Sequence, residues 1–379
     1  MGELSTRSFL RPVIAAADVH IRPAVRGDAL EVCGLLHRLE LNVPSSDHAE
    51  ACERHWDRLW DKNPYFEVFP GPVKYGWVME HAGRIRGFFG CIPRVYVNEG
   101  RSIPVAIASQ WGVEKEYRAH TTMLCDAFFN DDSFTTRLVT TAIKPTGRIF
   151  ERYGGAAMPD PSLMLVYMVP LRPEELIMHK LGPKARFLRP LIKLATAPLR
   201  WRTSRIKKDH RVREVPASDP PETMDEFWRR HIAGTNGMRA SRARPFLRWY
   251  LATGSRGLKK RMVVLEENGE VNAYAAFMEE PVPGSSIKRY KIIDLLVLDE
   301  RMKRTMIRAL TRLAYEEGAH VLEVHLPGMI GIKDIANHAV VRHVPQFPVY
   351  YHTTDPEVSR TITSGGLRIS PFDGDAALA

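Results

Sequence analysis

The sequence predicts a mixed α/β protein, with mixed sheets, that is built from two copies of one unit. Three observations support this fold class. Strand-type and helix-type segments alternate along the chain, hairpin signals occur at Ala82-Gly83 and Asn268-Gly269, and a long apolar strand follows each hairpin. These strands end 30 and 28 residues after the two hairpin glycines. A repeat of about 185 residues therefore accounts for the 379 residues of the chain.

The first copy opens with a strand at Val19 and then a helix, which Asp28 is placed to cap. Apolar residues recur at helical spacing from Leu30 to Leu39. A second helix stops at Pro64. The order continues with a hairpin, a long strand, a helix, a buried strand and a helix, over residues 76–92, 101–113, 115–131, 136–143 and 147–154.

The second copy repeats this order after an opening helix. We predict a helix, a hairpin, a long strand, a helix, a strand, a helix and a final strand, over residues 242–255, 261–280, 288–300, 301–318, 319–328, 333–345 and 347–354.

The composition excludes collagen-like, low-complexity and disulfide-scaffold proteins, because 44% of the residues are apolar and only four are cysteine. The first apolar run is broken by Arg11 and Pro12, so we expect no export signal, no transmembrane helix and a cytoplasmic protein. The pair Cys52 and His55 lacks a second ligand pair, so we expect no metal site. Packing is the expected role of the cysteines, which are Cys33, Cys52, Cys91 and Cys125.

Four motifs together resemble the GCN5-related N-acetyltransferase (GNAT) superfamily, of which the chain looks like a tandem member. They are Ile21-Arg22-Pro23-Ala24 with Asp28, the GRIRGFFG segment at 83–90, the strand end at 113–118, and IFERYGG at 149–155. The resemblance covers residues 19–172 well and 222–355 more weakly. We therefore expect a tail at 1–18, GNAT-like units at 19–172 and 216–355, a basic amphipathic segment at 173–215 and a tail at 356–379.

The resemblance implies an acyltransferase that moves an acyl group from a thioester to an amine or hydroxyl acceptor. The donor would be acyl-CoA or acyl carrier protein, the acceptor a small molecule, and no cofactor would be tightly bound. An extended pantetheine arm would lie along the end of the long strand, and the following helix N-terminus would face the phosphates. The residues at these positions are Gln110, Trp111, Gly112, Val113, Arg118, Thr121 and Thr122.

The sequence departs from the family at two places. The phosphate loop usually contains glycines, but this chain has Arg118-Ala119-His120-Thr121-Thr122-Met123, and Phe150 stands where a tyrosine often serves as general acid. Tandem proteins with such loops resemble other acyl-transfer families, among them the Fem-type aminoacyl-tRNA-dependent transferases. An aminoacyl-tRNA-dependent transferase and a catalytically silent binding protein at the membrane therefore remain alternatives.

Four residues are candidates for the chemistry. Glu114 could deprotonate an attacking ammonium or be a strand-end charge, and His120 could contact phosphate, act as a base or be a surface residue. Tyr153 lies three residues after Phe150 and could supply the general-acid hydroxyl that Phe150 lacks, or it could pack in the core. Asp294 holds in the second copy the strand position of Gln110, and could bind substrate or pair with an arginine.

The positive charge of the protein is concentrated in one segment. Residues 179–213 contain twelve lysines and arginines and a single acid, a net charge of +11, whereas the whole chain carries +10. As a helix, 186–201 would place Phe187 and Leu191 on an apolar side and Arg186 and Arg200 opposite them. We expect this segment to meet an anionic membrane surface, such as the inner membrane, or tRNA or acyl carrier protein, or to link the two units.

Overall fold

The computed structural model describes residues 15–69, 74–160, 165–252, 258–282, 284–326, 329–331, 335, 340–343 and 348–374. The chain divides into two compact units. Unit 1 comprises Met1–His55, Lys74–Cys91 and Gln110–Asp131, and unit 2 comprises Trp56–Val73, Ile92–Ser109 and Asp132–Ala379. No helix among the described residues is both long and apolar enough to cross a membrane.

Unit 1 is a small antiparallel sheet with three helices. Its strands are neighbours in the order β1, β2, β3, and α3 packs on β1 and β2. The helices bury apolar faces such as Leu35 and Leu36 of α1 and Leu124 of α3. The bounds are β1 His20–Pro23, β2 Gly76–His81, β3 Arg84–Asn98, β4 Arg101–Val113, α1 Ala29–Arg38, α2 Ala49–Trp56 and α3 Thr121–Phe129. β3 ends, and β4 begins, in unit 2.

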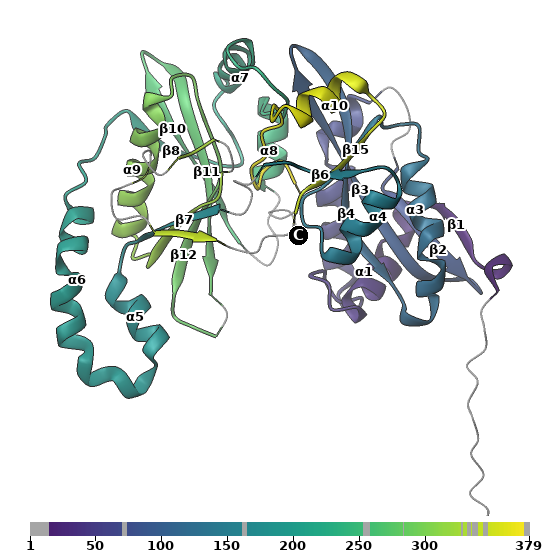
Figure 1. The fold of residues 1–379 in the computed structure, drawn as a ribbon, viewed down its shortest axis with the longest axis horizontal. Helices are drawn as coiled ribbons and strands as arrows, with labels where there is room; N and C mark the ends of the chain where they lie inside the picture. The colour runs from purple at the N-terminus through teal and green to yellow at the C-terminus, as the bar shows by residue number, and fades with distance from the viewer. Residues whose placement is uncertain are drawn as a thin grey trace, which may run out of the picture. The chain divides into compact units, whose positions relative to one another are not determined.

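Unit 2 contains a second sheet with the strand order β14-β7-β13-β12-β11-β10-β8 (Figure 1). Helix α9 (Arg301–Glu316) packs on β11, β12 and β13, and buries Met306, Ile307 and Leu310 in their core. The strands are β7 Leu165–Pro170, β8 Val212–Val215, β10 Lys260–Glu267, β11 Glu270–Pro281, β12 Lys288–Val297, β13 Val321–Val324 and β14 Val340–His343.

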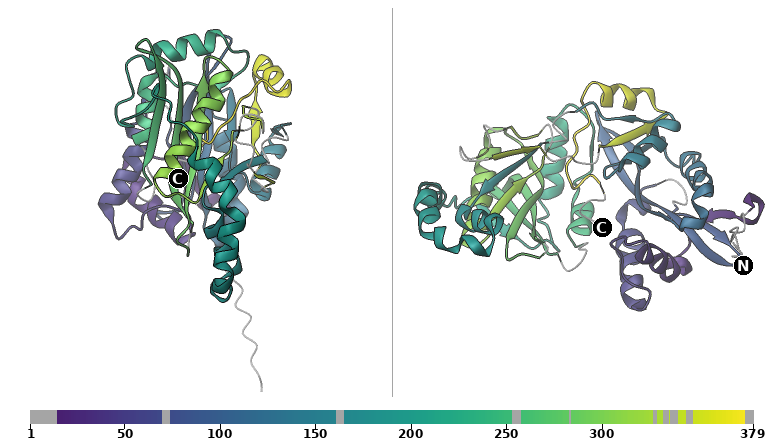
Figure 2. Two further views of the ribbon diagram at one scale, coloured as in Figure 1. Left: turned by 90° about the vertical axis from the view of Figure 1, so that its left-hand side faces the viewer. Right: turned by 60° about the horizontal axis from the view of Figure 1, so that its bottom comes forward.

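The remaining elements of unit 2 include β5, which pairs with β4, and three short strands beyond it or beside β3. β5 (Thr136–Val139) is parallel to β4, and β15 (Tyr350–Thr353) lies between β5 and β6 (Ala156–Ala157). The two-residue strand β9 (Arg239–Ala240) pairs with β3. The helices are α4 Lys144–Arg152, α5 Pro173–Leu181, α6 Arg189–Ser204, α7 Met224–Ala233, α8 Arg244–Ala252 and α10 Pro356–Thr363, of which α10 lies against β15 (Figure 2).

Each sheet takes a strand from the far half of the chain. β7 follows the last helix of the first copy, yet it pairs with β13 and β14 of the second sheet. β15 ends the second copy but pairs with β5 of the first sheet, whose strand order is β1-β2-β3-β4-β5-β15-β6. The first sheet therefore includes a strand from beyond residue 172, and the second sheet includes a strand from before residue 216.

The predicted hairpin turns are present. Ala82 and Gly83 have φ values of 51° and 69°, and Asn268 and Gly269 have 55° and 79°. Two consecutive left-handed residues form the turn that matches the twist of an antiparallel pair. A third turn of this kind, at Glu99-Gly100, joins β3 to β4.

The structure corrects three expectations. The helix expected over 333–345 is wrong at its end, where residues 340–343 form β14, and most of its other residues lie outside the described ones. The helix expected at 115–131 divides into a 3-10 helix, η5 (Lys115–His120), and α3. The expected tail at 356–379 contains α10 and the buried residues Leu367 and Phe372, while residues 1–14 and 375–379 lie outside the described part.

Candidate functional site

β4 continues beyond the end of β5, its parallel neighbour. Its register with β5 runs from Val105 to Ile107, and β5 itself ends at Val139. β4 goes on to Val113, where the following backbone N–H, that of Glu114, donates to the carbonyl oxygen of Arg86 on β3. The end of β4 is therefore held by β3 and extends past β5, and among the described residues no strand is registered with its other edge beyond Ile107. An extended ligand can add to a strand edge of this kind.

Gln110 lies in this extension in an unusual conformation. Its φ is +51°, in the left-handed region that residues with a side chain seldom adopt. Its side-chain amide Nε2 lies 2.7 Å from Nε2 of His55, a buried residue of α2, and donates to that ring nitrogen. A hydrogen bond to a neighbouring helix thus holds the strained residue in place.

The next residues of β4 contribute to the core of unit 1. The ring of Trp111 stacks on Phe89 with a centroid separation of 4.7 Å. An added Cβ at Gly112 would lie 2.8 Å from Leu39 and 2.9 Å from Leu36. Val113 is buried. Gly112 therefore faces α1, and the backbone is the part of this segment best suited to contact a donor.

Glu114 follows the strand and is held by two arginines. Its Oε1 accepts a hydrogen bond of 2.9 Å from Arg38 of α1, and its Oε2 accepts one of 3.1 Å from Arg86 of β3. The carboxylate is about one-fifth exposed. The strand-end charge is thus fixed in position by two guanidinium groups rather than freely solvated.

The turn after Glu114 is the helix η5, and α3 begins at Thr121. His120 is the N-cap residue of α3, and the hydroxyl of Thr121 donates 2.8 Å to the carbonyl oxygen of Arg118. Arg118 is exposed, while His120 and Thr122 are half-buried. The candidate phosphate-contacting residues are therefore together at one helix N-terminus, where the helix dipole favours an anion.

In the second sheet, β12 also extends past its parallel neighbour, but this extension is occupied. Its register with β13 ends at Ile292, and a bulge follows, since Ala276 pairs with Asp294 while Phe277 pairs with Ile292. The backbone N–H of Phe372 donates 3.1 Å to the carbonyl oxygen of the bulged Ile293. The protein's own C-terminal segment lies where a ligand would meet the strand.

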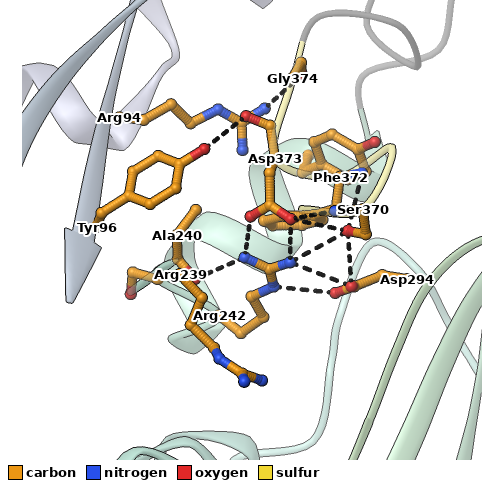
Figure 3. A network of polar contacts seen from close by, with 12 residues as sticks. Arg94, Tyr96, Arg239, Ala240, Arg242, Asp294, Ser370, Phe372, Asp373 and Gly374 are labelled. Carbon is orange, nitrogen blue, oxygen red and sulfur yellow. Dashed lines mark hydrogen bonds and ion pairs between the residues drawn. The ribbon is translucent and has the colours of Figure 1, made fainter. Parts of the chain in front are cut away.

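Asp294 is part of a buried ion network (Figure 3). Its carboxylate accepts hydrogen bonds from Nε and Nη2 of Arg242, at 3.0 and 3.1 Å, and from the hydroxyl of Ser370 at 2.9 Å. Asp373 accepts a further 2.9 Å bond from Arg242 Nη2. Asp294 and Asp373 have no exposed surface. The geometry favours the ion-pair alternative for Asp294 over substrate binding, and places Asp373 in the same network.

Phe150 and the candidate Tyr153 lie at the end of α4. Phe150 is fully buried and its ring centroid lies 6.4 Å from that of Tyr350. Tyr153 is the C-cap residue, and its backbone N–H bonds the carbonyl of Ile149. The Tyr153 side chain is half-buried. The general-acid role of Tyr153 stays a prediction.

The residues that hold Glu114, Gln110 and Asp294 in place were not predicted from the sequence. Arg38, Arg86 and His55 anchor Glu114 and Gln110, but each lies on a segment that periodicity explains as helix or strand. Arg242 and Ser370 lie 52 and 76 residues from Asp294, and no local pattern connects them. Within the described residues no group of three or more His, Cys, Asp or Glu is arranged to hold a metal ion.

Neither a protein-family model nor a curated protein sequence matches this chain. Solved structures do match it. A GCN5-related N-acetyltransferase from Anabaena variabilis is 11% identical with a TM-score of 0.58, over 89% of this chain and 73% of that one. Eis1 from Mycobacterium abscessus is 14% identical with a TM-score of 0.53, over 91% and 75%.

A third similar structure is Saccharomyces cerevisiae N-myristoyltransferase with bound myristoyl-CoA. It is 12% identical with a TM-score of 0.50, over 93% of this chain and 89% of that one. At identities this low, the comparisons show a shared fold and do not show a shared activity. The chain has the fold of the GCN5-related N-acetyltransferases, built from two such units.

Proposed function

We propose that the protein is an acyltransferase that takes an acyl group from a thioester, acyl-CoA or acyl carrier protein, and transfers it to a small amine or hydroxyl acceptor. One observation carries the proposal: β4 runs past β5 and contains the left-handed Gln110 at the start of its free edge. Strained backbone that is held by its surroundings is concentrated at functional sites.

The donor's extended arm would add to β4 between Gln110 and Val113 through backbone hydrogen bonds. Its phosphates would meet the first N–H groups of α3 and the exposed Arg118. His120, Thr121 and Thr122 surround that position. The likeness to an N-myristoyltransferase with bound myristoyl-CoA supports a thioester donor for this fold.

The reaction would join the acceptor's nitrogen or oxygen to the thioester carbonyl carbon. The carbon–sulfur bond breaks, and sulfur leaves as a thiol after it receives a proton. The acceptor loses a proton, and Glu114 is the proposed base, since it follows the donor strand directly and Arg38 and Arg86 hold its carboxylate in place. His120 is the second candidate base.

We assign donor binding to the β4 edge and not to the β12 edge. Phe372, Ser370 and Asp373 occupy the β12 bulge with backbone and side-chain hydrogen bonds. The buried network would have to open before a thioester could reach Ile293, and breaking a buried ion pair is costly.

The test compares two substitutions at one position. Proline fixes φ near −65° and cannot adopt the Gln110 conformation, whereas glycine adopts it readily and removes only the side chain. We expect Gln110→Pro to abolish the rise in melting temperature that palmitoyl-CoA, acetyl-CoA or acylated carrier protein causes, and Gln110→Gly to retain it. Circular dichroism checks that both variants fold.

Measuring the melting temperature with each candidate donor in turn, charged tRNA included, forms a donor panel. This panel also distinguishes the alternative functions. Stabilisation by palmitoyl-CoA alone identifies a coenzyme A donor, and stabilisation by the carrier protein alone identifies that donor. Stabilisation by charged tRNA alone would establish the aminoacyl-tRNA-dependent alternative. If no donor stabilises the protein, the proposal fails and a silent binding protein remains.

A further inference from the structure

Large exposed apolar side chains are concentrated on α5, α6 and η7 (Pro183–Leu188), the 3-10 helix that joins them. Among the described residues, six of the ten exposed large hydrophobic side chains lie between residues 177 and 201. We call these six the α5–α6 surface: Ile177, Leu181, Phe187, Leu191, Leu194 and Trp201, of which Phe187 and Leu194 are 77% and 75% exposed. A concentration of this kind marks an interaction site.

The side of α6 that faces α5 and α9 is packed against these helices. Figures 1 and 2 show α5 and α6 as neighbouring helices, and α6 packs on both α5 and α9. Thr196 and Thr203 are buried, and Arg200 donates 2.9 Å to the buried Glu174 of α5. Arg200, which was expected opposite Phe187 and Leu191, therefore pairs with α5 while those two side chains are exposed.

The outer side of α6 is apolar along one stripe. Leu191, Leu194 and Trp201 of α6 are spaced by three and seven residues, which places them on one side of the helix, and the exposed Phe187 precedes them on η7. Phe187 and Leu191 were expected to pack inward if the segment is only a linker, but both are exposed. The linker alternative does not account for them.

The charge around this stripe has one sign. Residues 176–208 contain ten lysines and arginines and no Asp or Glu. Arg189 and Arg200 pair with Glu175 and Glu174. The other eight form no ion pair within the described residues: Lys180, Lys184, Arg186, Lys193, Arg202, Arg205, Lys207 and Lys208.

We propose that the α5–α6 surface docks on an anionic lipid bilayer. The apolar stripe would enter the boundary between headgroups and acyl chains, and the neighbouring cations would meet lipid phosphates. The guanidinium of Arg205 lies 3.7 Å from the Trp201 ring centroid, so one pair presents both an aromatic face and a charge. This inference goes beyond the proposed acyl transfer and does not depend on it.

A lipid bilayer fits this surface better than RNA does. RNA binding needs cations and aromatic faces on which bases stack, whereas Leu191 and Leu194 are aliphatic and among the most exposed large apolar side chains of the described residues. A groove of about 750 Å³ in unit 2 offers charge without such a stripe, because Lys207 and Lys208 line it together with Arg304 and Arg308 of α9. The two sites can therefore be tested separately.

The test measures sedimentation of the full chain with vesicles in the absence of any acyl donor. We expect binding to vesicles of phosphatidylcholine mixed with phosphatidylglycerol and much weaker binding to phosphatidylcholine alone. The double substitution Leu191→Ser with Leu194→Ser should weaken binding about ten-fold or more, because both side chains are exposed and would enter the bilayer. Lys193→Glu with Arg202→Glu should also weaken it.

Leu30→Ser with Ile143→Ser is the matched control, since both residues are exposed and apolar, but Leu30 lies on α1 and Ile143 is the N-cap residue of α4. It should leave binding unchanged, as should Arg308→Glu in the groove. The proposal is overturned if the protein fails to bind anionic vesicles, if the Leu191 and Leu194 variant binds them as the wild type does, or if the control loses binding equally. Salt-sensitive binding of tRNA without vesicle binding would identify a nucleic-acid surface instead.

Discussion

The backbone N–H of Phe372 donates a 3.1 Å hydrogen bond to the carbonyl oxygen of Ile293, in the bulge of β12. This bond joins the C-terminal segment to the strand edge that corresponds to the end of β4. The two copies of the fold thus differ at the same place. In one copy the extension begins with the strained Gln110, and in the other the chain itself lies against the bulge.

The Asp294 network predicts a large loss of stability on substitution. Asp294→Ala leaves the buried Arg242 with Asp373 as its one carboxylate partner, and should lower the free energy of unfolding by about 3–5 kcal/mol. Urea denaturation measures this change. Glu357→Gln, at an exposed pair with Arg101, should cost at most about 1 kcal/mol.

If Asp294 bound substrate instead, its substitution would change activity and leave the urea midpoint nearly unchanged. A loss of less than about 1 kcal/mol in Asp294→Ala would therefore contradict the structural role.

Substitution of Glu114 should slow the chemical step. Glu114→Gln keeps the shape of the side chain but removes its capacity to accept the acceptor's proton, so kcat should fall by about 10²–10⁴-fold. KM for the donor should change much less. The assay is thiol release from the thioester that the donor panel identifies. Glu116→Gln, an exposed neighbour on η5, is the matched control and should retain activity. Unchanged kcat in Glu114→Gln would transfer the role of base to His120.

The packing of Gly112 predicts a cost for the smallest possible side chain. A Cβ there would lie within 3 Å of Leu36 and Leu39, so Gly112→Ala should destabilise the protein by about 1–3 kcal/mol. Thermal unfolding measures the effect. Gly27→Ala is the control, because an added Cβ there meets nothing within 4 Å. Equal melting temperatures for the two variants would mean that Leu36 and Leu39 can shift to accommodate the added Cβ without a loss of stability.

His231 predicts a loss of stability in acid. Burial, with the charge of Arg239 beside it, lowers the pKa of His231 from 6.5 to about 3. Its Nδ1–H donates to the carbonyl oxygen of Val297, and its Nε2 lies 2.6 Å from Nη1 of Arg239. The unfolded chain therefore binds a proton between pH 6.5 and pH 3 that the folded chain does not.

This contribution is full above pH 6.5 and is lost as the pH falls toward 3, by up to about 1.4 kcal/mol per pH unit. Urea midpoints measured between pH 7 and pH 5 should fall less steeply in His231→Gln than in the wild type. His210→Gln, at an exposed residue, should retain the wild-type slope. A slope unchanged in His231→Gln would show that His231 does not set the acid sensitivity.

Much of the fold followed from local pattern. The turns at Ala82-Gly83 and Asn268-Gly269 were predicted because their residue types and flanking strands report the local backbone directly. The long strands and α9 followed from hydrophobic periodicity, which also reports local structure. The order of these elements sufficed to predict the fold, although no sequence match accompanies it.

The candidate site could be predicted only in part. The resemblance to the GNAT superfamily places it on the segment from Gln110 to Thr122, and this placement stays a prediction. The left-handed φ of Gln110 and its bond to His55 did not follow from the sequence, because both depend on how α2 packs beside the strand. The same holds for Arg38 and Arg86, which meet at Glu114 from different elements.

The sequence by itself determined the strand and helix order, its repetition and the single basic segment, since these depend on neighbouring residues. Tertiary structure alone decided three other features. β7 and β15 each joined the other sheet, Asp294 became a buried partner of Arg242, and Phe187 and Leu191 turned outward. The physical reason is that strand pairing, ion pairing and burial join residues far apart in the chain, for which periodicity contains no signal.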